Sequence, residues 1–177
     1  MKRTTLVTLA ALACAAAPFT VAAAAEKVDA RHEIDRLDVP LGDMTCTGQT
    51  MATAKRAGYP TRAHLHVEKD LDGYWVAFHY DEEKTAENAN PYHVAQYIGF
   101  NEKSKHFDSV TMDSTGTGPT LGTTSGWNGN SMTVEEHVSD GAYRDVFTKT
   151  ADSMAHEGMV QGKDKKWVKT DEETCRK

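Results

Sequence analysis

The chain has 177 residues, 39% of them hydrophobic, with 20 basic against 26 acidic residues and a net charge of −6. This acidic balance argues against nucleic acid and against an anionic membrane surface as partners, because both attract basic proteins. No segment is apolar over the roughly 20 residues that a membrane-spanning helix needs, so we expect no integral membrane segment.

The first 25 residues have the three parts of a secretory signal peptide. Basic Lys2 and Arg3 precede an apolar run over residues 6–17, and small alanines follow before the first acidic residue. Cleavage after residue 25 leaves 18 basic against 26 acidic residues, a net charge of −8. We therefore expect an exported protein, periplasmic or secreted, with about 150 residues in one domain. Lipidation at Cys14 is the alternative fate of this segment.

A helical pattern opens the remaining chain. Ala30, Ile34 and Leu37 stand at the i, i+4, i+7 spacing of one helix face, and charged residues fill the positions between them. Pro40 then ends the pattern. The sequence predicts a short N-terminal helical segment over residues 26–42.

From residue 43 to residue 177 the pattern changes to short alternating segments separated by turn residues, which is typical of an antiparallel all-β domain. The expected strands are residues 43–51, 61–70, 74–81, 93–100, 106–113, 120–127, 131–138, 143–150, 153–161 and 166–175. A meander of about ten strands leaves two exposed edges unless it closes into a barrel.

Tight turns between these strands predict that neighbours in sequence pair with each other. Three dipeptides tolerate the positive φ angles of type I′ hairpins, namely Asp72-Gly73, Asn128-Gly129 and Asp140-Gly141. The first of these turns places His66 opposite His79, and the last places Val134 opposite Phe147.

Two cysteines remain after cleavage, and an even number in an exported chain predicts a disulfide. Cys46 falls in the first expected strand and Cys175 in the last. A bond between them is natural in a closed barrel, because closure brings the first and last strands side by side. On the chain-entropy model such a bond stabilises the fold by about 4 to 5 kcal/mol. Two free thiols are the alternative.

Short motifs are spread over most of the mature chain, namely Leu41-Gly42-Asp43, Gly73-Tyr74-Trp75, Tyr97-Ile98-Gly99-Phe100-Asn101, Asp113-Ser114, Arg144-Asp145-Val146 and Arg176-Lys177. In this order they resemble an uncharacterised bacterial family of calycin-like β-barrels. The resemblance implies a ten-stranded barrel similar to lipocalins, fatty-acid-binding proteins and nitrobindins, with a short helix near one opening. It implies no catalytic residue, and it implies apolar ligands or haem as guests of the lumen. Met44 departs from the pattern where the family tends to carry Trp, and Cys175 where an aromatic residue is common.

Apolar residues on one face of the expected strands predict the interior of the barrel. They are Leu65, Val67, Val76, Phe78, Phe107, Met132, Val134 and Phe147. In a barrel of this strand number they can line a cavity for a small ligand or fill a solid core. We expect a non-catalytic binding protein for a small apolar or amphipathic molecule. A filled barrel that serves as an envelope interaction or scaffold module is one alternative.

Three histidines share the other face of the first hairpin, since His64 and His66 lie on one strand and His79 on its partner. Three imidazoles with an open position can bind zinc or copper. Histidines that simply face solvent are the favoured interpretation, because Glu68 is the only nearby carboxylate to orient the rings. Haem has many potential ligands on later strands and none that stands out, including His93, His106, His137, His156, Met112, Met132, Met154 and Met159. The sequence therefore predicts no cofactor.

Catalysis finds one weak candidate. The Asp140-Gly141 turn places Glu136 opposite Asp145, and two facing carboxylates can raise a pKa as an acid–base pair requires. A barrel enzyme of isomerase or cyclase type is therefore the second alternative function, although no catalytic residue is predicted. No sequence feature predicts the oligomeric state.

Overall fold

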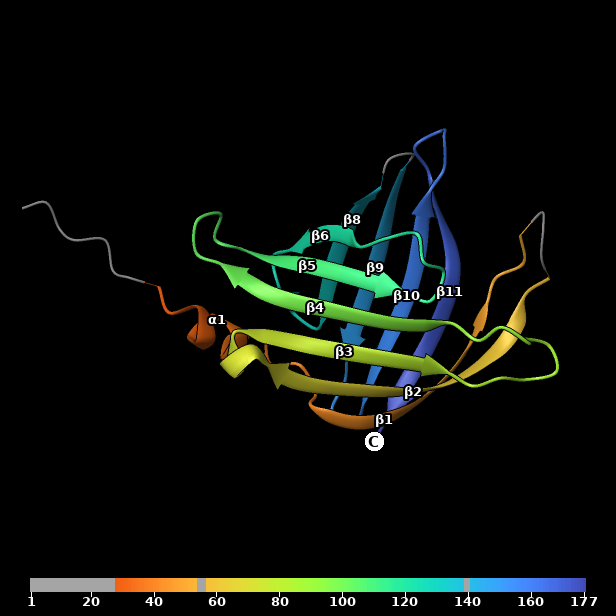
Figure 1. Cartoon of the computed structure of the whole chain (residues 1–177), viewed down its shortest axis with the longest axis horizontal. Helices are drawn as coiled ribbons and strands as arrows, with labels where there is room; N and C mark the ends of the chain where they lie inside the picture. Colours follow the sequence, from red (N-terminus) through yellow and green to blue (C-terminus); the bar gives the residue numbers. More distant parts are fainter. Residues whose placement is uncertain (1–27, 54–56, 139–140) are drawn as a thin grey trace, which may run out of the picture.

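The computed structural model describes residues 28–53, 57–138 and 141–177, which form one antiparallel sheet, the short helix α1 and a single 3₁₀ turn η1 (Figure 1). The predicted signal peptide, residues 1–25, lies outside the described residues. No helix in the described ranges is long and apolar enough to cross a membrane. The elements are α1 (Ala30–Arg36), β1 (Gly42–Thr50), β2 (Tyr59–Asp70), η1 (Leu71–Gly73), β3 (Trp75–Glu82), β4 (His93–Asn101), β5 (His106–Asp113), β6 (Thr120–Thr124), β7 (Trp127–Asn128), β8 (Ser131–Val138), β9 (Gly141–Lys149), β10 (Ser153–Gln161) and β11 (Trp167–Arg176).

The sheet is closed on itself. Strands that follow one another in sequence are neighbours, with the exception of β6 and β7, which both pair with β8. The first strand, β1, pairs with the last, β11. In the β1–β11 ladder Cys46 stands opposite Cys175, and their sulfur atoms lie at bonding distance, 2.01 Å apart. The predicted closed antiparallel barrel, with its first and last strands joined at this cysteine pair, is confirmed.

Strand alternation explains which side chains enter the barrel. Along β2, Thr61, Ala63, Leu65 and Val67 are buried, while the residues between them are exposed or half-buried. Successive side chains of a strand point to opposite faces. The apolar and small residues of the strand therefore share the inner face, and His64 and its charged neighbours face outward.

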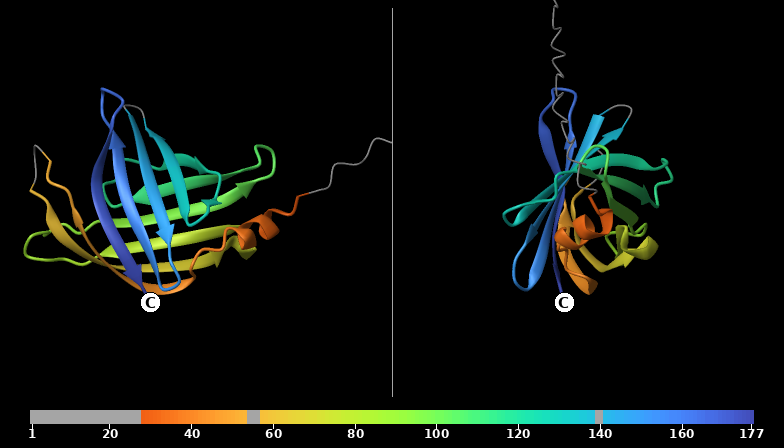
Figure 2. Two further views of the ribbon diagram at one scale, coloured as in Figure 1. Left: turned by 180° about the vertical axis from the view of Figure 1, so that it is seen from behind. Right: turned by 90° about the vertical axis from the view of Figure 1, so that its left-hand side faces the viewer.

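Helix α1 closes one end of the barrel. The Asp29 carboxylate caps its first turn by accepting a hydrogen bond from the Arg31 amide at 3.0 Å. Ile34 and Leu37 are each 1% exposed and pack into the core of the barrel, and the Trp127 indole donates a hydrogen bond to the Leu37 carbonyl. The helix is shorter than the predicted segment over residues 26–42, and it lies across the end of the strands in both views of Figure 2.

The first predicted hairpin has the expected pairing through a different turn. Leu71, Asp72 and Gly73 all have positive φ angles, of 48°, 59° and 81°, so the loop is longer than a two-residue type I′ turn. The loop is centred at the predicted position, so the register of the two strands is the predicted one. His66 pairs with His79 as predicted.

The turn predicted at Asp140-Gly141 is wrong. Gly141 belongs to β9 and pairs with Val138, so Val134 stands opposite Asp145 and not opposite Phe147. This shift of two residues leaves every side chain on its predicted face, because the period of a strand is two. Glycine permits a turn without requiring one, and both registers bury the same apolar residues, so the hydrophobic pattern could not separate them.

The turn predicted at Asn128-Gly129 lies one position later in the structure. Asn128 is the last residue of β7 and pairs with Ser131, and Gly129 has the positive φ angle of 62° that the turn requires. The expected strand over residues 120–127 is interrupted, so that β6 and β7 pair separately with β8.

Candidate functional site

The barrel interior has two halves. In the packed half, next to α1, apolar side chains fill the lumen; its members include Val67, Val76, Ile98, Phe107, Met132 and Val134. In the other half lies a cavity of about 1450 Å³. Residues 89–92, from the β3–β4 connection, and residues 114, 115 and 117–119, from the β5–β6 connection, line its mouth. Both connections lie at the end of the barrel away from α1 (Figure 1).

The residues predicted to line the lumen divide between these halves. All eight are buried, but Leu65, Phe78 and Phe147 are the ones that line the cavity. The other five, Val67, Val76, Phe107, Met132 and Val134, belong to the packed half. Strand alternation determines the face on which a side chain lies. It does not determine how far along the barrel axis that side chain sits.

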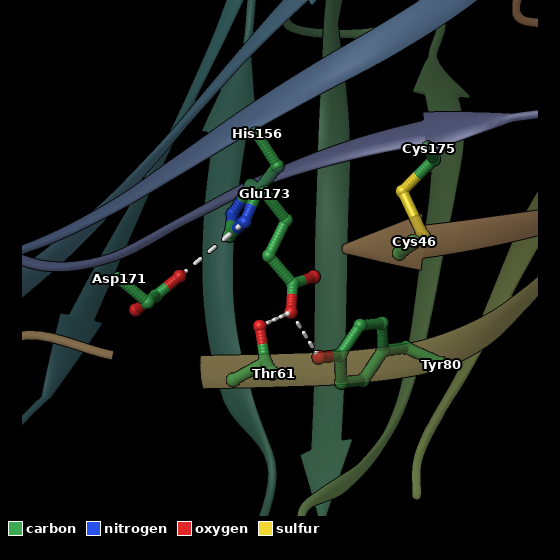
Figure 3. Close-up of a disulfide and its surroundings, with 7 residues drawn as sticks. All are labelled: Cys46, Thr61, Tyr80, His156, Asp171, Glu173 and Cys175. Carbon is green, nitrogen blue, oxygen red and sulfur yellow. Dashed lines mark hydrogen bonds and ion pairs between the residues drawn. A yellow bond between two sulfur atoms is a disulfide. The ribbon is translucent and has the colours of Figure 1, made fainter. Parts of the chain in front are cut away.

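Glu173 is a buried carboxyl group of the cavity wall, only 8% exposed. Its Oε1 accepts hydrogen bonds from the Thr61 hydroxyl at 2.6 Å and from the Tyr80 hydroxyl at 2.5 Å (Figure 3). Burial raises the pKa of Glu173 despite these donors. Burial and the adjacent Glu173 also raise the pKa of Tyr80 above its usual range, so its hydroxyl keeps its proton.

Two more buried carboxyl groups face the same cavity. Glu82, 5% exposed, accepts hydrogen bonds at Oε2 from the Asn88 side chain and from the Tyr92 amide, both at 2.7 Å. Glu136, 4% exposed, accepts at Oε1 from the side chains of Gln96, Ser109 and Thr111. Burial raises the pKa of Glu136 above its usual value.

His156 brings a positive charge into this wall. Its Nε2 lies 3.0 Å from Asp145 Oδ1. Its Nδ1 lies 3.4 Å from Asp171 Oδ1, as Figure 3 shows. Burial alone would lower the pKa of His156, but the hydrogen bond and charge of Asp145, with the charges of Asp171 and Glu173, raise it to about 9. The ring is therefore an imidazolium at neutral pH. Gly158 leaves room for this arrangement, because a Cβ there would lie 2.3 Å from Asp171 Oδ2.

The predicted pairing of Glu136 with Asp145 is wrong. Tyr143 stands opposite Glu136 in the β8–β9 ladder, because of the register shift, and Asp145 is bound to His156. Both carboxyl groups do line the cavity. A signal for the buried acids was present in the sequence: Glu136 follows Met132 and Val134 on one strand face.

The same signal applies to the last strand. Glu173 lies two residues before Cys175, whose predicted bond to the first strand directs it inward. Acidic residues at inward positions are the signal of a polar cavity wall, which the predicted apolar interior did not include.

The three candidate metal-binding histidines lie on the outer face of the barrel. The side chains of His64, His66 and His79 are 70%, 44% and 37% exposed. His64 has Glu83 as its carboxylate neighbour, whereas His66 and His79 share Glu68. Within the described part of the chain, one group of three metal-type donors lies within 4.8 Å, and it consists of Cys46, Cys175 and Glu173. The two sulfur atoms of that group are bonded to each other.

The candidate haem ligands are scattered. His93, His137, His156, Met154 and Met159 line the cavity. In contrast, Met132 is in the packed half, Met112 is exposed, and His106 lines a separate surface groove. The cavity thus collects part of this set. Two of its rings are held by carboxylates, since His93 Nδ1 lies 2.8 Å from Asp81 Oδ1 and His156 has both nitrogens next to carboxylates.

Comparison with known proteins gives a structural relative. No protein-family model matches this sequence, and no curated protein matches it either. The barrel is similar to the crystal structure of Rv2717c from M. tuberculosis, with a TM-score of 0.62 over 81% of this chain and 96% of that one. The likeness is one of fold. At 11% sequence identity it concerns the architecture of the barrel alone.

Proposed function

We propose that this protein is an exported, non-catalytic binding protein that holds a small amphipathic molecule in the barrel lumen. The cavity carries the proposal. Ligand pockets of proteins usually have volumes of about 300 to 1,000 Å³, so a cavity of about 1450 Å³ with one mouth has room for such a molecule. The cysteine pair at bonding distance fits an oxidising compartment, where exported proteins work.

The lining of the cavity is amphipathic, which supports a ligand of the same character. Leu65, Phe78, Phe147 and Met154 give an apolar surface at the inner side, next to the packed half. The buried carboxyl groups form polar walls. A molecule with an apolar part and a polar group would match both surfaces.

The bonding of the polar groups supports binding rather than reaction. Both nitrogens of His156 are next to carboxylates, so the ring offers no free base to a substrate. The Tyr80 hydroxyl donates to Glu173 and has a raised pKa, which makes it a poor nucleophile. These groups hold one another in place.

Native mass spectrometry of the protein purified from its own compartment tests the proposal. We expect a small molecule bound in a one-to-one ratio and lost on unfolding. Thr120→Trp, which places an indole at the mouth, should reduce binding of the neutral apolar dye Nile red about tenfold. Leu121→Trp is the matched control, because Leu121 is 61% exposed on the outside of the same strand. A protein that carries no small molecule and leaves Nile red fluorescence unchanged contradicts the proposal.

A further inference from the structure

Acidic residues dominate the charge of the cavity lining. Six acidic residues contribute to its surface, namely Glu82, Asp113, Glu136, Asp145, Asp171 and Glu173. No lysine or arginine is found among the described lining residues, and His156 is bound between two of the six acids. The charge of the lining is therefore negative, and low-dielectric walls strengthen its effect on a bound molecule.

Three of these acids each present an unused oxygen to the lumen. Glu82, Glu136 and Glu173 are more than nine-tenths buried, and in each one oxygen accepts all the hydrogen bonds of the carboxyl group. Across the described residues, no side-chain oxygen or nitrogen that is fully buried lacks a hydrogen-bond partner. The second oxygens, which have no partner, must therefore be reached from the cavity.

The pKa shifts agree with this geometry. Burial raises the pKa of both Glu136 and Glu173, although the charge of His156 lowers the pKa of Glu173 in part. No lysine or arginine in the described lining is there to neutralise them. An ammonium group beside such an oxygen would donate a charge-assisted hydrogen bond to it and reduce the cost of the buried negative charge. The carboxylate of a fatty acid would meet like charges and would find no lysine or arginine in the described lining to bind it.

Aromatic rings add a second feature that favours a cation. Tyr59, Tyr80, Tyr92, Phe78 and Phe147 all contribute to the lining. The faces of aromatic rings attract cations, and the rings also offer apolar area to a hydrocarbon chain.

We propose that the ligand of the lumen is an organic cation, an amphipathic amine whose ammonium group is attracted by the buried carboxyl groups Glu82, Glu136 and Glu173 and whose apolar part lies on Leu65, Phe78 and Met154. This inference rests on the proposed binding function and names the chemical class of the ligand. The resemblance to fatty-acid-binding barrels implies apolar guests, and the charge of this cavity replaces that expectation with a cationic one.

A series of probes with equal chains and different charges tests the inference on the unmodified protein. Octylamine, octan-1-ol and octanoate are titrated against the purified protein by isothermal calorimetry at pH 7.5 and low ionic strength. We expect octylamine to bind at least about tenfold more tightly than octan-1-ol, and octanoate to bind most weakly. Equal affinity for the amine and the alcohol, or tighter binding of octanoate, overturns the cationic ligand while leaving the binding function intact. Binding of none of the three overturns the binding function itself.

Variants locate the effect in the cavity. Glu136→Gln combined with Glu173→Gln should lower the affinity for octylamine about tenfold and leave the affinity for octan-1-ol unchanged. The alcohol therefore also reports whether the variant has folded. Glu157→Gln is the matched control, because Glu157 is on the same sheet, pairs with Lys169 and is not part of the cavity lining. If the control lowers amine affinity as much as the double variant does, the attraction comes from overall charge and the proposed site is wrong. Should the double variant fail to bind the alcohol, Glu82→Gln provides the same test at a third oxygen.

Discussion

The packed half and the cavity are built by the same strands and differ in what those strands place inside. On β8, Met132 and Val134 fill the packed half, and Glu136, the next residue on the same face, belongs to the cavity wall. On β10, Met154 gives the cavity part of its apolar surface, and His156, the next residue on the same face, belongs to its polar wall. In this barrel the alternation along a strand determines which side chains point inward. The position along the barrel axis determines whether an inward side chain is apolar or polar.

Loss of the cysteine pair should have the largest effect on the stability of the barrel. Cys175 belongs both to the core and to the cavity lining. Replacing Cys46 and Cys175 by serine should lower the free energy of unfolding by about 4 to 5 kcal/mol, since the bond closes a loop with a sequence separation of 129. Urea unfolding of the variant and the parent measures this difference. An unchanged midpoint would show that the barrel is closed without help from the bond.

Two methionines allow a matched comparison of the halves. Met132 is 0% exposed in the packed half, and Met154 is 1% exposed at the cavity. Met132→Ala should lower the free energy of unfolding by about 3 kcal/mol, because it creates a void among close-packed side chains. Met154→Ala should lower it by only about 1 to 2 kcal/mol, because it enlarges a cavity that already exists. Equal losses in urea unfolding would mean that the cavity end is packed as tightly as the other.

His156 makes the stability of the cavity half depend on pH. Its pKa of about 9 in the folded protein lies above the usual value of 6.5, so the folded state keeps a proton that the unfolded state loses. This contribution, at most about 3 kcal/mol, is fully present below pH 6.5 and is lost as the pH rises through about 9. His156→Gln should remove it. The test compares the unfolding free energies of parent and variant from pH 6 to 10, and a difference that does not change with pH contradicts the assignment.

The cap of α1 should have the smallest effect and reports on the closed end alone. Asp29→Ala removes the acceptor for the Arg31 amide and should lower the free energy of unfolding by about 1 kcal/mol. Ligand binding at the opposite end should not change. A loss of Nile red binding in this variant would show that the two ends are coupled.

Much of the fold could be predicted from the sequence, because the alternation of apolar and polar residues indicates the strands and the turn residues between them indicate which strands pair. The strand over residues 153–161 was predicted with the boundaries it has in the structure, and the pairing of His66 with His79 followed from a turn signal. The cysteine pair identified the first and last strands as neighbours. The register of β8 on β9 was missed, since two arrangements bury the same side chains.

The candidate site was less predictable. The face of Val67 and Phe78 was correct, yet only Phe78 lines the cavity, because depth along the axis depends on the tilt and stagger of all the strands together. The buried acids were visible as inward positions, but their burial depends on donors far away in sequence, such as Thr61 for Glu173. Long-range partners of this kind leave no trace in the pattern of a single strand.

Helix α1 and the side chains packed against it close one end of the barrel, so the lumen is open at the other end only. A guest can neither thread through it nor pass from one side to the other, so it departs by the same route along which it arrived. The residence time of such a guest should then depend on the two segments that line the mouth, which include residues 89–92 and 117–119. Exchange kinetics should accordingly respond to changes in those two segments while the melting behaviour of the barrel stays the same.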